Sequence, residues 1–267
     1  MLKDITLGQY FPGNSVIHRL DPRTKLIITI LYIAALFTAS GPFAYLLVMC
    51  YMMIQVVLSK IKPGIILKGL RPLVILITVT AILNMFYTPG RILVQVWILT
   101  LTYEGIVRSV SMILRIVFLV IGSFLLTYTT SPLSLTDGLE RLMGPLKRIK
   151  FPAHELSMMM STALRFIPTL IEETDKIMSA QRARGANFDT GNFLRRAKAL
   201  LPVLVPLFIS AFRRADDLAV AMESRCYIGG KGRTRMTELR LTAIDFIWCA
   251  IALALLAAVI IMRVPGL

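Results

Sequence analysis

The sequence is 267 residues long, and 56% of its residues are hydrophobic, against about 45–50% in a typical soluble domain. Its net charge is +15, from 30 Lys and Arg against 15 Asp and Glu. The apolar residues gather in long runs, which indicates a membrane protein, and no basic–aromatic platform accompanies the charge as it would in a nucleic-acid-binding protein. Attraction to the anionic lipid of an inner leaflet accounts for the positive charge.

The three cysteines and two histidines do not form a set that could hold a metal ion or a disulfide. Cys50, Cys226 and Cys249 are scattered, and neither His18 nor His154 has a neighbour at ligand spacing. The run Gly229-Gly230-Lys231-Gly232 lacks the earlier Gly and the Ser or Thr after Lys that a phosphate-binding loop requires. We therefore expect no metal, no cofactor and no ATP binding by this chain.

The N-terminal part of the chain predicts an interfacial segment and then two membrane spans. Residues 1–21 lack the continuous apolar core of a cleavable signal peptide. Residues 26–59 carry no charge and are too long for one span of about 20 residues. Because Ser40-Gly41-Pro42 is a helix-breaking combination, we expect spans at roughly 24–39 and 42–59.

Three more apolar stretches predict further spans, at 72–87, 105–130 and 241–262. Arg108 and Arg115 lie inside the second of them, and because a charge in the bilayer is costly, we expect both to snorkel or to face neighbouring helices. Residues 91–104 are apolar but short, and they fit either an interfacial helix or an extended loop. The sequence therefore predicts about five spans, and the count depends on residues 91–104.

The distribution of positive charge predicts the orientation. Most of the Lys and Arg lie in residues 1–25, 60–71 and 131–240, and the positive-inside rule places these parts in the cytoplasm. The predicted organisation is an interfacial segment with spans one to four at 1–130, a cytoplasmic helical module at 131–240, and a last span at 241–267.

Two long amphipathic segments in the cytoplasmic module, at 154–184 and 193–225, follow the same plan. Each is apolar in its first half and charged in its second, which is typical of a helix that starts against a membrane domain and emerges into the cytosol. Pro168, Pro202 and Pro206 lie inside them. Since proline removes a helix hydrogen bond, we expect both helices to be bent or segmented.

These two segments also end alike, in Ala183-Arg184-Gly185 and in Ser224-Arg225-Cys226, so that the two arginines are 41 positions apart. A Gly after the last turn suits a left-handed helix cap, and a cation suits the negative end of the helix dipole, so helix termination explains one such end. Two matched ends point to a further role, because small neighbours leave each guanidinium free to enter a groove and its planar fork binds carboxylates.

Together with Asp21-Pro22-Arg23-Thr24-Lys25-Leu26 and Arg165-Phe166-Ile167-Pro168, these paired ends make the chain resemble the T component, the transmembrane subunit of energy-coupling factor (ECF) transporters, over nearly its whole length. The resemblance implies an all-α polytopic membrane protein with a cytoplasmic module of crossed amphipathic coupling helices. It also implies a multi-pass location in the plasma membrane of a prokaryote.

In function, the resemblance implies a non-catalytic scaffold of an ABC-type importer. Such a subunit joins two ATPases, identical or different, to an S component, a small membrane protein that captures a vitamin or a metal ion. The residues expected to dock the ATPases are Ala183, Arg184, Gly185, Ser224, Arg225 and Cys226. The expected S-component contact is an apolar cluster early in the first amphipathic segment, because the flexible methionine side chain suits a surface that slides against its partner. The cluster consists of Leu156, Met158, Met159 and Met160.

Two other classes of protein compete with this interpretation. A stand-alone secondary transporter or channel would show ionisable groups at mid-bilayer and inverted repeats, and only Arg108, Arg115 and Asn84 qualify. A membrane-embedded enzyme acting on lipid would show clustered acids or histidines near the interface, and this sequence has no such cluster.

Overall fold

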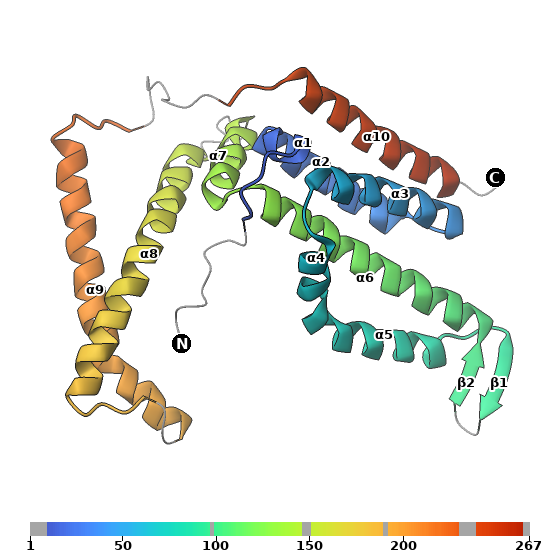
Figure 1. The fold of residues 1–267 in the computed structure, drawn as a ribbon, viewed down its shortest axis with the longest axis horizontal. Helices are drawn as coiled ribbons and strands as arrows, with labels where there is room; N and C mark the ends of the chain where they lie inside the picture. The colour runs from blue at the N-terminus through green and yellow to red at the C-terminus, as the bar shows by residue number, and fades with distance from the viewer. Residues whose placement is uncertain (1–9, 97–98, 146–150, 189–191, 230–238, 264–267) are drawn as a thin grey trace. The chain divides into compact units, whose positions relative to one another are not determined.

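A computed structural model of the chain describes residues 10–96, 99–145, 151–188, 192–229 and 239–263. Packing divides these residues into two units. The membrane unit comprises residues 10–139 and 239–263, and the arm unit comprises residues 140–229. Each unit is described by itself, and Figure 1 labels the elements of both.

The membrane unit is built almost entirely from helices. In chain order its elements are α1 (Val16–Arg19), α2 (Pro22–Thr38), α3 (Pro42–Ser59), α4 (Pro63–Leu70), the 3-10 turn η1 (Arg71–Leu73), α5 (Val74–Tyr87), strands β1 (Ile92–Val96) and β2 (Leu99–Thr102), α6 (Tyr103–Thr129), α7 (Pro132–Leu142), which continues past residue 139, and α10 (Ala243–Arg263).

Four helical stretches in the described chain are long and apolar enough to cross a membrane: Pro42–Ser59, Pro63–Tyr87, Tyr103–Thr129 and Ala243–Arg263. Helix α2 has 17 residues, the lower end of the length that spans a bilayer, and it packs against α6 and α10. The predicted all-α polytopic fold is confirmed.

Residues 92–96 and 99–102 are extended strands and α6 begins at Tyr103, so of the two alternatives that the sequence left open for residues 91–104, these strands match the extended one. Strands β1 and β2 pair antiparallel, as suits a segment rich in β-branched residues. Two side chains join the hairpin to the start of α6. The Glu104 carboxylate accepts the Arg91 backbone N–H at 2.6 Å, and the Thr102 hydroxyl accepts the Gly105 N–H at 3.1 Å while donating to the Thr88 carbonyl at 2.8 Å.

The core of the membrane unit lies where α2, α3, α6 and α10 meet. Ala35, Leu36, Val48, Ala252 and Val259 have no exposed surface. Small residues on facing helices allow the close backbone approach by which membrane helices associate. This core fixes the start of α10 beside the start of α2.

Arg115 faces neighbouring helices, as predicted. Its guanidinium donates to the Tyr45 hydroxyl at 2.9 Å and to the Ala39 carbonyl at 3.4 Å, and it lies 5.9 Å from the centre of the Phe37 ring. The Ala39 carbonyl belongs to the C-terminal end of α2, where carbonyl groups lack helical partners. Arg115 therefore joins α6 to the end of α2 and the start of α3.

The arm unit contains two long helices, α8 (Ala153–Ala183) and α9 (Phe193–Glu223), of 31 residues each. Of the two predicted outcomes, bent or segmented, segmentation does not occur, because Pro168 lies within continuous α8, and Pro202 and Pro206 lie within continuous α9. One hydrogen bond lost per proline is a small fraction of those that remain in a helix of this length. Figure 1 shows that α9 changes direction in its first half, the half that carries its two prolines.

Candidate functional site

The end of α8 is closed by backbone hydrogen bonds that follow from Gly185. This residue has a φ of +89°, a left-handed conformation that glycine adopts without steric cost. The Gly185 N–H donates to the Arg182 carbonyl at 2.9 Å, and the Ala186 N–H donates to the Gln181 carbonyl at 2.9 Å. These two bonds make a Schellman motif, in which Arg184 is the last residue before the chain reverses.

The end of α9 has the same geometry, although its left-handed residue is not glycine. Cys226 has a φ of +55°. Its N–H donates to the Glu223 carbonyl at 2.9 Å, and the Tyr227 N–H donates to the Met222 carbonyl at 3.0 Å. A side chain in this conformation costs about 1–2 kcal/mol. We call the end of α8 the first tip and the end of α9 the second tip. Both tips are closed by a Schellman motif, but in the second tip the left-handed residue is strained.

Arg184 and Arg225 therefore occupy equivalent positions, each immediately before the left-handed residue. Both side chains are exposed, and within the described residues neither guanidinium forms a hydrogen bond or an ion pair. Each lies at the negative end of a helix dipole, which favours a cation. The geometry presents two guanidinium groups that a carboxylate-bearing surface could bind.

The two tips lie at opposite ends of the helix pair, because α8 and α9 pack against each other while running in opposite directions (Figure 1). An ion pair joins the helices, with the Arg214 guanidinium 2.6 Å from the Glu173 carboxylate. These two residues are also 41 positions apart, so each lies the same distance along its helix before Arg184 or Arg225.

The predicted apolar contact on α8 is partly on the surface. The Met159 and Met160 side chains are exposed, whereas Leu156 and Met158 are half-buried. Sequence reasoning missed a larger apolar surface on α9. The run of apolar residues in the first half of α9 was the sequence feature that could have indicated it. Its exposed members are Leu200, Leu201, Leu204, Val205, Phe208, Ile209 and Phe212.

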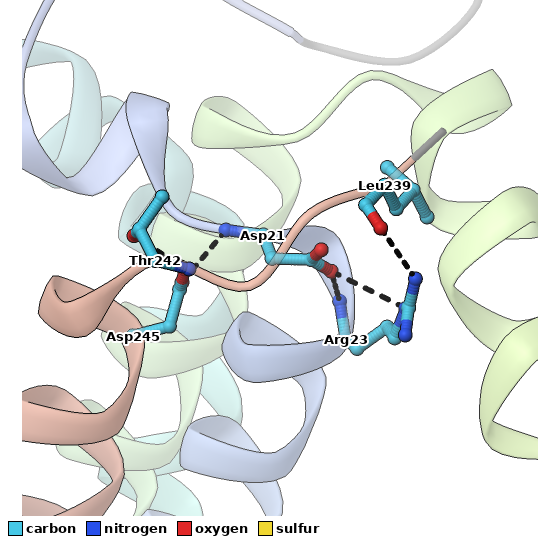
Figure 2. A network of polar contacts seen from close by, with 5 residues as sticks. All are labelled: Asp21, Arg23, Leu239, Thr242 and Asp245. Carbon is cyan, nitrogen blue, oxygen red and sulfur yellow. Dashed lines mark hydrogen bonds and ion pairs between the residues drawn. The ribbon is translucent and has the colours of Figure 1, made fainter. Parts of the chain in front are cut away.

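The motif Asp21–Lys25 holds helices of the membrane unit together, a role that sequence reasoning did not find (Figure 2). The buried Asp245 carboxylate accepts the Asp21 backbone N–H at 2.9 Å. It also accepts the Thr242 N–H at 2.8 Å and the Thr242 hydroxyl at 2.7 Å. A single carboxylate thus caps the start of α10 and holds the residue that precedes α2.

The other members of the motif strengthen this junction. The Asp21 carboxylate accepts the Arg23 N–H at 2.9 Å, which caps α2, and the Arg23 guanidinium donates to the Leu239 carbonyl at 3.1 Å. The buried Lys25 ammonium donates to the Thr129 carbonyl at 2.8 Å and to the His18 carbonyl at 3.2 Å. The motif joins the ends of α1, α2, α6 and α10, so it belongs to the framework of the membrane unit.

The signal that could have identified Asp245 is its position, since it is a lone acid at the start of an apolar span, where a buried charge needs partners. No three His, Cys, Asp or Glu side chains come together as metal ligands in the part of the chain that the structure describes.

Comparison with known proteins gives concordant matches. The family model described as CbiQ, cobalt transport protein, matches residues 13–236. A curated relative from Thermosediminibacter oceani, the energy-coupling factor transporter transmembrane protein EcfT, is 55% identical over 244 residues, which cover 91% of this chain and 92% of the relative. Proteins of the same name from Clostridium kluyveri and Ruminiclostridium cellulolyticum are 52% and 50% identical, and each match covers at least 98% of both chains.

Proposed function

The chain belongs to the family of energy-coupling factor transporter transmembrane proteins, and on that premise we propose that it is the scaffold and coupling subunit of an ECF-type ABC importer. In this proposal it hydrolyses no ATP itself. It joins two ABC-type ATPases to an S component that captures a vitamin or a metal ion, and the S component selects the cargo. The chain lies in the plasma membrane of a prokaryote with its arm unit in the cytoplasm.

The observation that carries the proposal is the pair of matched tips. Arg184 and Arg225 are exposed residues at equivalent positions of two identical backbone motifs. Helix termination alone requires the left-handed residue that follows, but it does not require an arginine before it at both ends. A planar, permanently charged fork suits a partner groove lined by carboxylates, and two such tips suit a pair of related ATPases.

The apolar surfaces of the arm unit support the second partner. Met159 and Met160 on α8 are exposed, as are seven apolar residues between Leu200 and Phe212 on α9, and a group of exposed apolar side chains marks an interaction surface. In the proposal these surfaces face the S component at the membrane boundary. Methionine side chains adapt to changing contacts, which suits a partner that reorients during transport.

The arrangement of α8 and α9 suggests how motion is transmitted. The helices contact each other, and the Glu173–Arg214 ion pair lies between them. When the ATPases close on ATP, the two tips are displaced relative to each other, and the arms carry this displacement to the membrane unit and the S component. The S component then reorients and releases its cargo inward.

The proposal is tested by co-purification with the ATPases in mild detergent. Arg184→Ala, Arg225→Ala and the double variant are compared with Arg182→Ala, which removes the same charge two residues before the first tip. Truncating a desolvated charged contact costs about 2–5 kcal/mol, so each tip variant should lose most of the bound ATPase or uncouple hydrolysis from uptake. Arg182→Ala should retain both properties.

The double variant provides the outcome that contradicts the proposal. If it keeps full ATPase binding and normal uptake, the tips have no docking role. The same co-purification separates the scaffold from a stand-alone secondary transporter or channel, because two ATPase chains should accompany the scaffold and none need accompany the others.

A further inference from the structure

A groove on the membrane unit runs between the start of α3 and the first half of α6. Its volume is about 550 Å³, and its walls are mainly apolar. Side chains on both helices leave it open to the surroundings, since Leu46 on α3 and Val107 and Val110 on α6 are each about half exposed. Buried Tyr45 and Phe118 lie at its floor. Because α3 and α6 are both long and apolar enough to cross a membrane, the groove between them is at a depth where lipid chains lie.

The groove is longer than one leaflet of the hydrocarbon core is thick. It follows α6 from Tyr103 to Phe118, which is roughly 22 Å at 1.5 Å per residue. Half of a hydrocarbon core is about 15 Å thick. An acyl chain that starts at the membrane surface and follows α6 would therefore lie within this groove for its whole length.

A second hollow adjoins the groove at the start of α6. Its volume is about 410 Å³, and it shares Tyr103 and Val107 with the groove. The aromatic side chains of Tyr87 and Tyr103 are exposed beside it, and exposed tyrosines at helix ends mark the headgroup level of a bilayer. The hollow therefore lies at the depth of lipid headgroups, while the groove lies at the depth of their chains.

The hollow contains one charge of each sign. Arg108 is exposed, and among the described residues its guanidinium has no ion-pair or hydrogen-bond partner. Glu104, one helical turn earlier, also lines the hollow, and one of its oxygens accepts the Arg91 N–H. A guanidinium binds phosphate, and a carboxylate accepts hydrogen bonds from an ammonium group.

We propose that the hollow and the groove together bind one phospholipid with a primary amine in its headgroup, such as phosphatidylethanolamine. Its phosphate binds Arg108, its ammonium group binds Glu104, and one acyl chain lies in the groove between α3 and α6. The site depends on the membrane location of the chain, and it is independent of ATPase docking by the tips.

The test uses the full chain reconstituted with equal amounts of phosphatidylethanolamine, phosphatidylcholine and phosphatidylglycerol. Lipid that remains bound after gentle extraction is counted by native mass spectrometry. An exposed ion pair changes affinity by roughly twofold to fivefold, so phosphatidylethanolamine should exceed phosphatidylglycerol by that factor, and it should exceed phosphatidylcholine by a smaller factor because the choline cation can still pair with Glu104. Choline cannot donate a hydrogen bond to Glu104, and the glycerol headgroup carries no cation for it.

Three variants separate the parts of the site. Arg108→Gln should lower retention of all three lipids, whereas the matched control Arg263→Gln, which changes an exposed arginine at the end of α10, should not. Glu104→Gln should abolish the preference among headgroups while leaving total retention near its original level. Val110→Trp should fill the groove and reduce retention of every lipid. All three variants should bind the ATPases normally.

A photoreactive residue at Leu46 identifies the occupant of the groove directly, and it should capture lipid. Capture of another protein chain at this position would overturn the proposal. The proposal would also be overturned if the three lipids were retained equally and Arg108→Gln did not change their retention. Failure of the lipid site leaves the tip variants informative, because those variants are measured by ATPase capture.

Discussion

The buried carboxylate of Asp245 allows a quantitative prediction about the stability of the membrane unit. Asp245→Ala removes the acceptor of three hydrogen bonds, from the Asp21 N–H, the Thr242 N–H and the Thr242 hydroxyl. A buried donor that loses its partner costs about 1–3 kcal/mol. The Asp21 N–H is the buried donor, and the two part-buried bonds from Thr242 are worth about 0.5–1.5 kcal/mol each, so we expect a loss of about 2–6 kcal/mol.

Asp245→Asn should have a smaller effect. Its side-chain oxygen can still accept the Asp21 N–H, but its amide nitrogen then faces the Thr242 N–H, so that two donors oppose each other. Because the bond from the Thr242 N–H is only part-buried, its loss corresponds to about 0.5–1.5 kcal/mol. The order of stability should therefore be parent, Asp245→Asn, then Asp245→Ala.

The assay is thermal unfolding of the full chain in mild detergent. A change of 1 kcal/mol shifts the midpoint by roughly 2–4 °C for 150–250 residues, so Asp245→Ala should unfold roughly 10 °C lower. Asp216→Ala is the matched control, because it removes an exposed acid on α9 and should leave the midpoint unchanged. An Asp245→Ala midpoint equal to that of the parent would refute the reasoning. If this variant does not fold, Asp245→Asn carries the test.

Three further predictions concern other parts of the chain. In a double-mutant cycle, Glu173→Gln and Arg214→Gln should show a coupling energy of about 0.2–1 kcal/mol, because both side chains are partly exposed; additive effects would mean that the ion pair contributes nothing. Cys226→Gly should stabilise the last turn of α9 by about 1 kcal/mol, since glycine has no strain at positive φ, and hydrogen exchange there should slow, whereas faster exchange would contradict the assigned conformation. Burial lowers the pKa of His18 below its ordinary value of 6.5, and Lys25 lowers it further, so the fold favours neutral His18. The contribution of His18 to stability is therefore present above pH 6.5 and lost as pH falls toward the lowered pKa. His18→Gln should reduce this acid dependence of the unfolding midpoint, and an unchanged dependence would assign it to other groups.

Local rules were sufficient to predict the first tip from sequence. An Arg followed by Gly at the end of a charged helical segment predicts a left-handed cap, and Gly185 adopts it. Cys226 could not be assigned in the same way, because cysteine has no preference for positive φ. Its place in the repeated triplet, opposite Gly185, was the only sign of its conformation.

Contacts between distant residues explain most of what the sequence did not reveal. Asp21 and Asp245 are 224 positions apart, and no spacing rule connects them. The prolines of the arms show a limit of local rules. Such a rule does not decide between a bend and an interruption, and α9 bends but continues through Pro202 and Pro206 (Figure 1), because its many remaining hydrogen bonds and its contact with α8 outweigh the bonds lost.

The bond between Asp21 and Asp245 has a consequence for the order in which the protein is made. The ribosome makes α10 long after α2, so α2 enters the bilayer before Asp245, which accepts the Asp21 N–H, has been made. Until then that amide lacks its native partner, and the α2 surface that α10 covers stays open to lipid or to the insertion machinery. Packing of α10 onto α2 therefore has to wait until α10 has been made, and a nascent chain truncated before α10 should leave this surface of α2 uncovered.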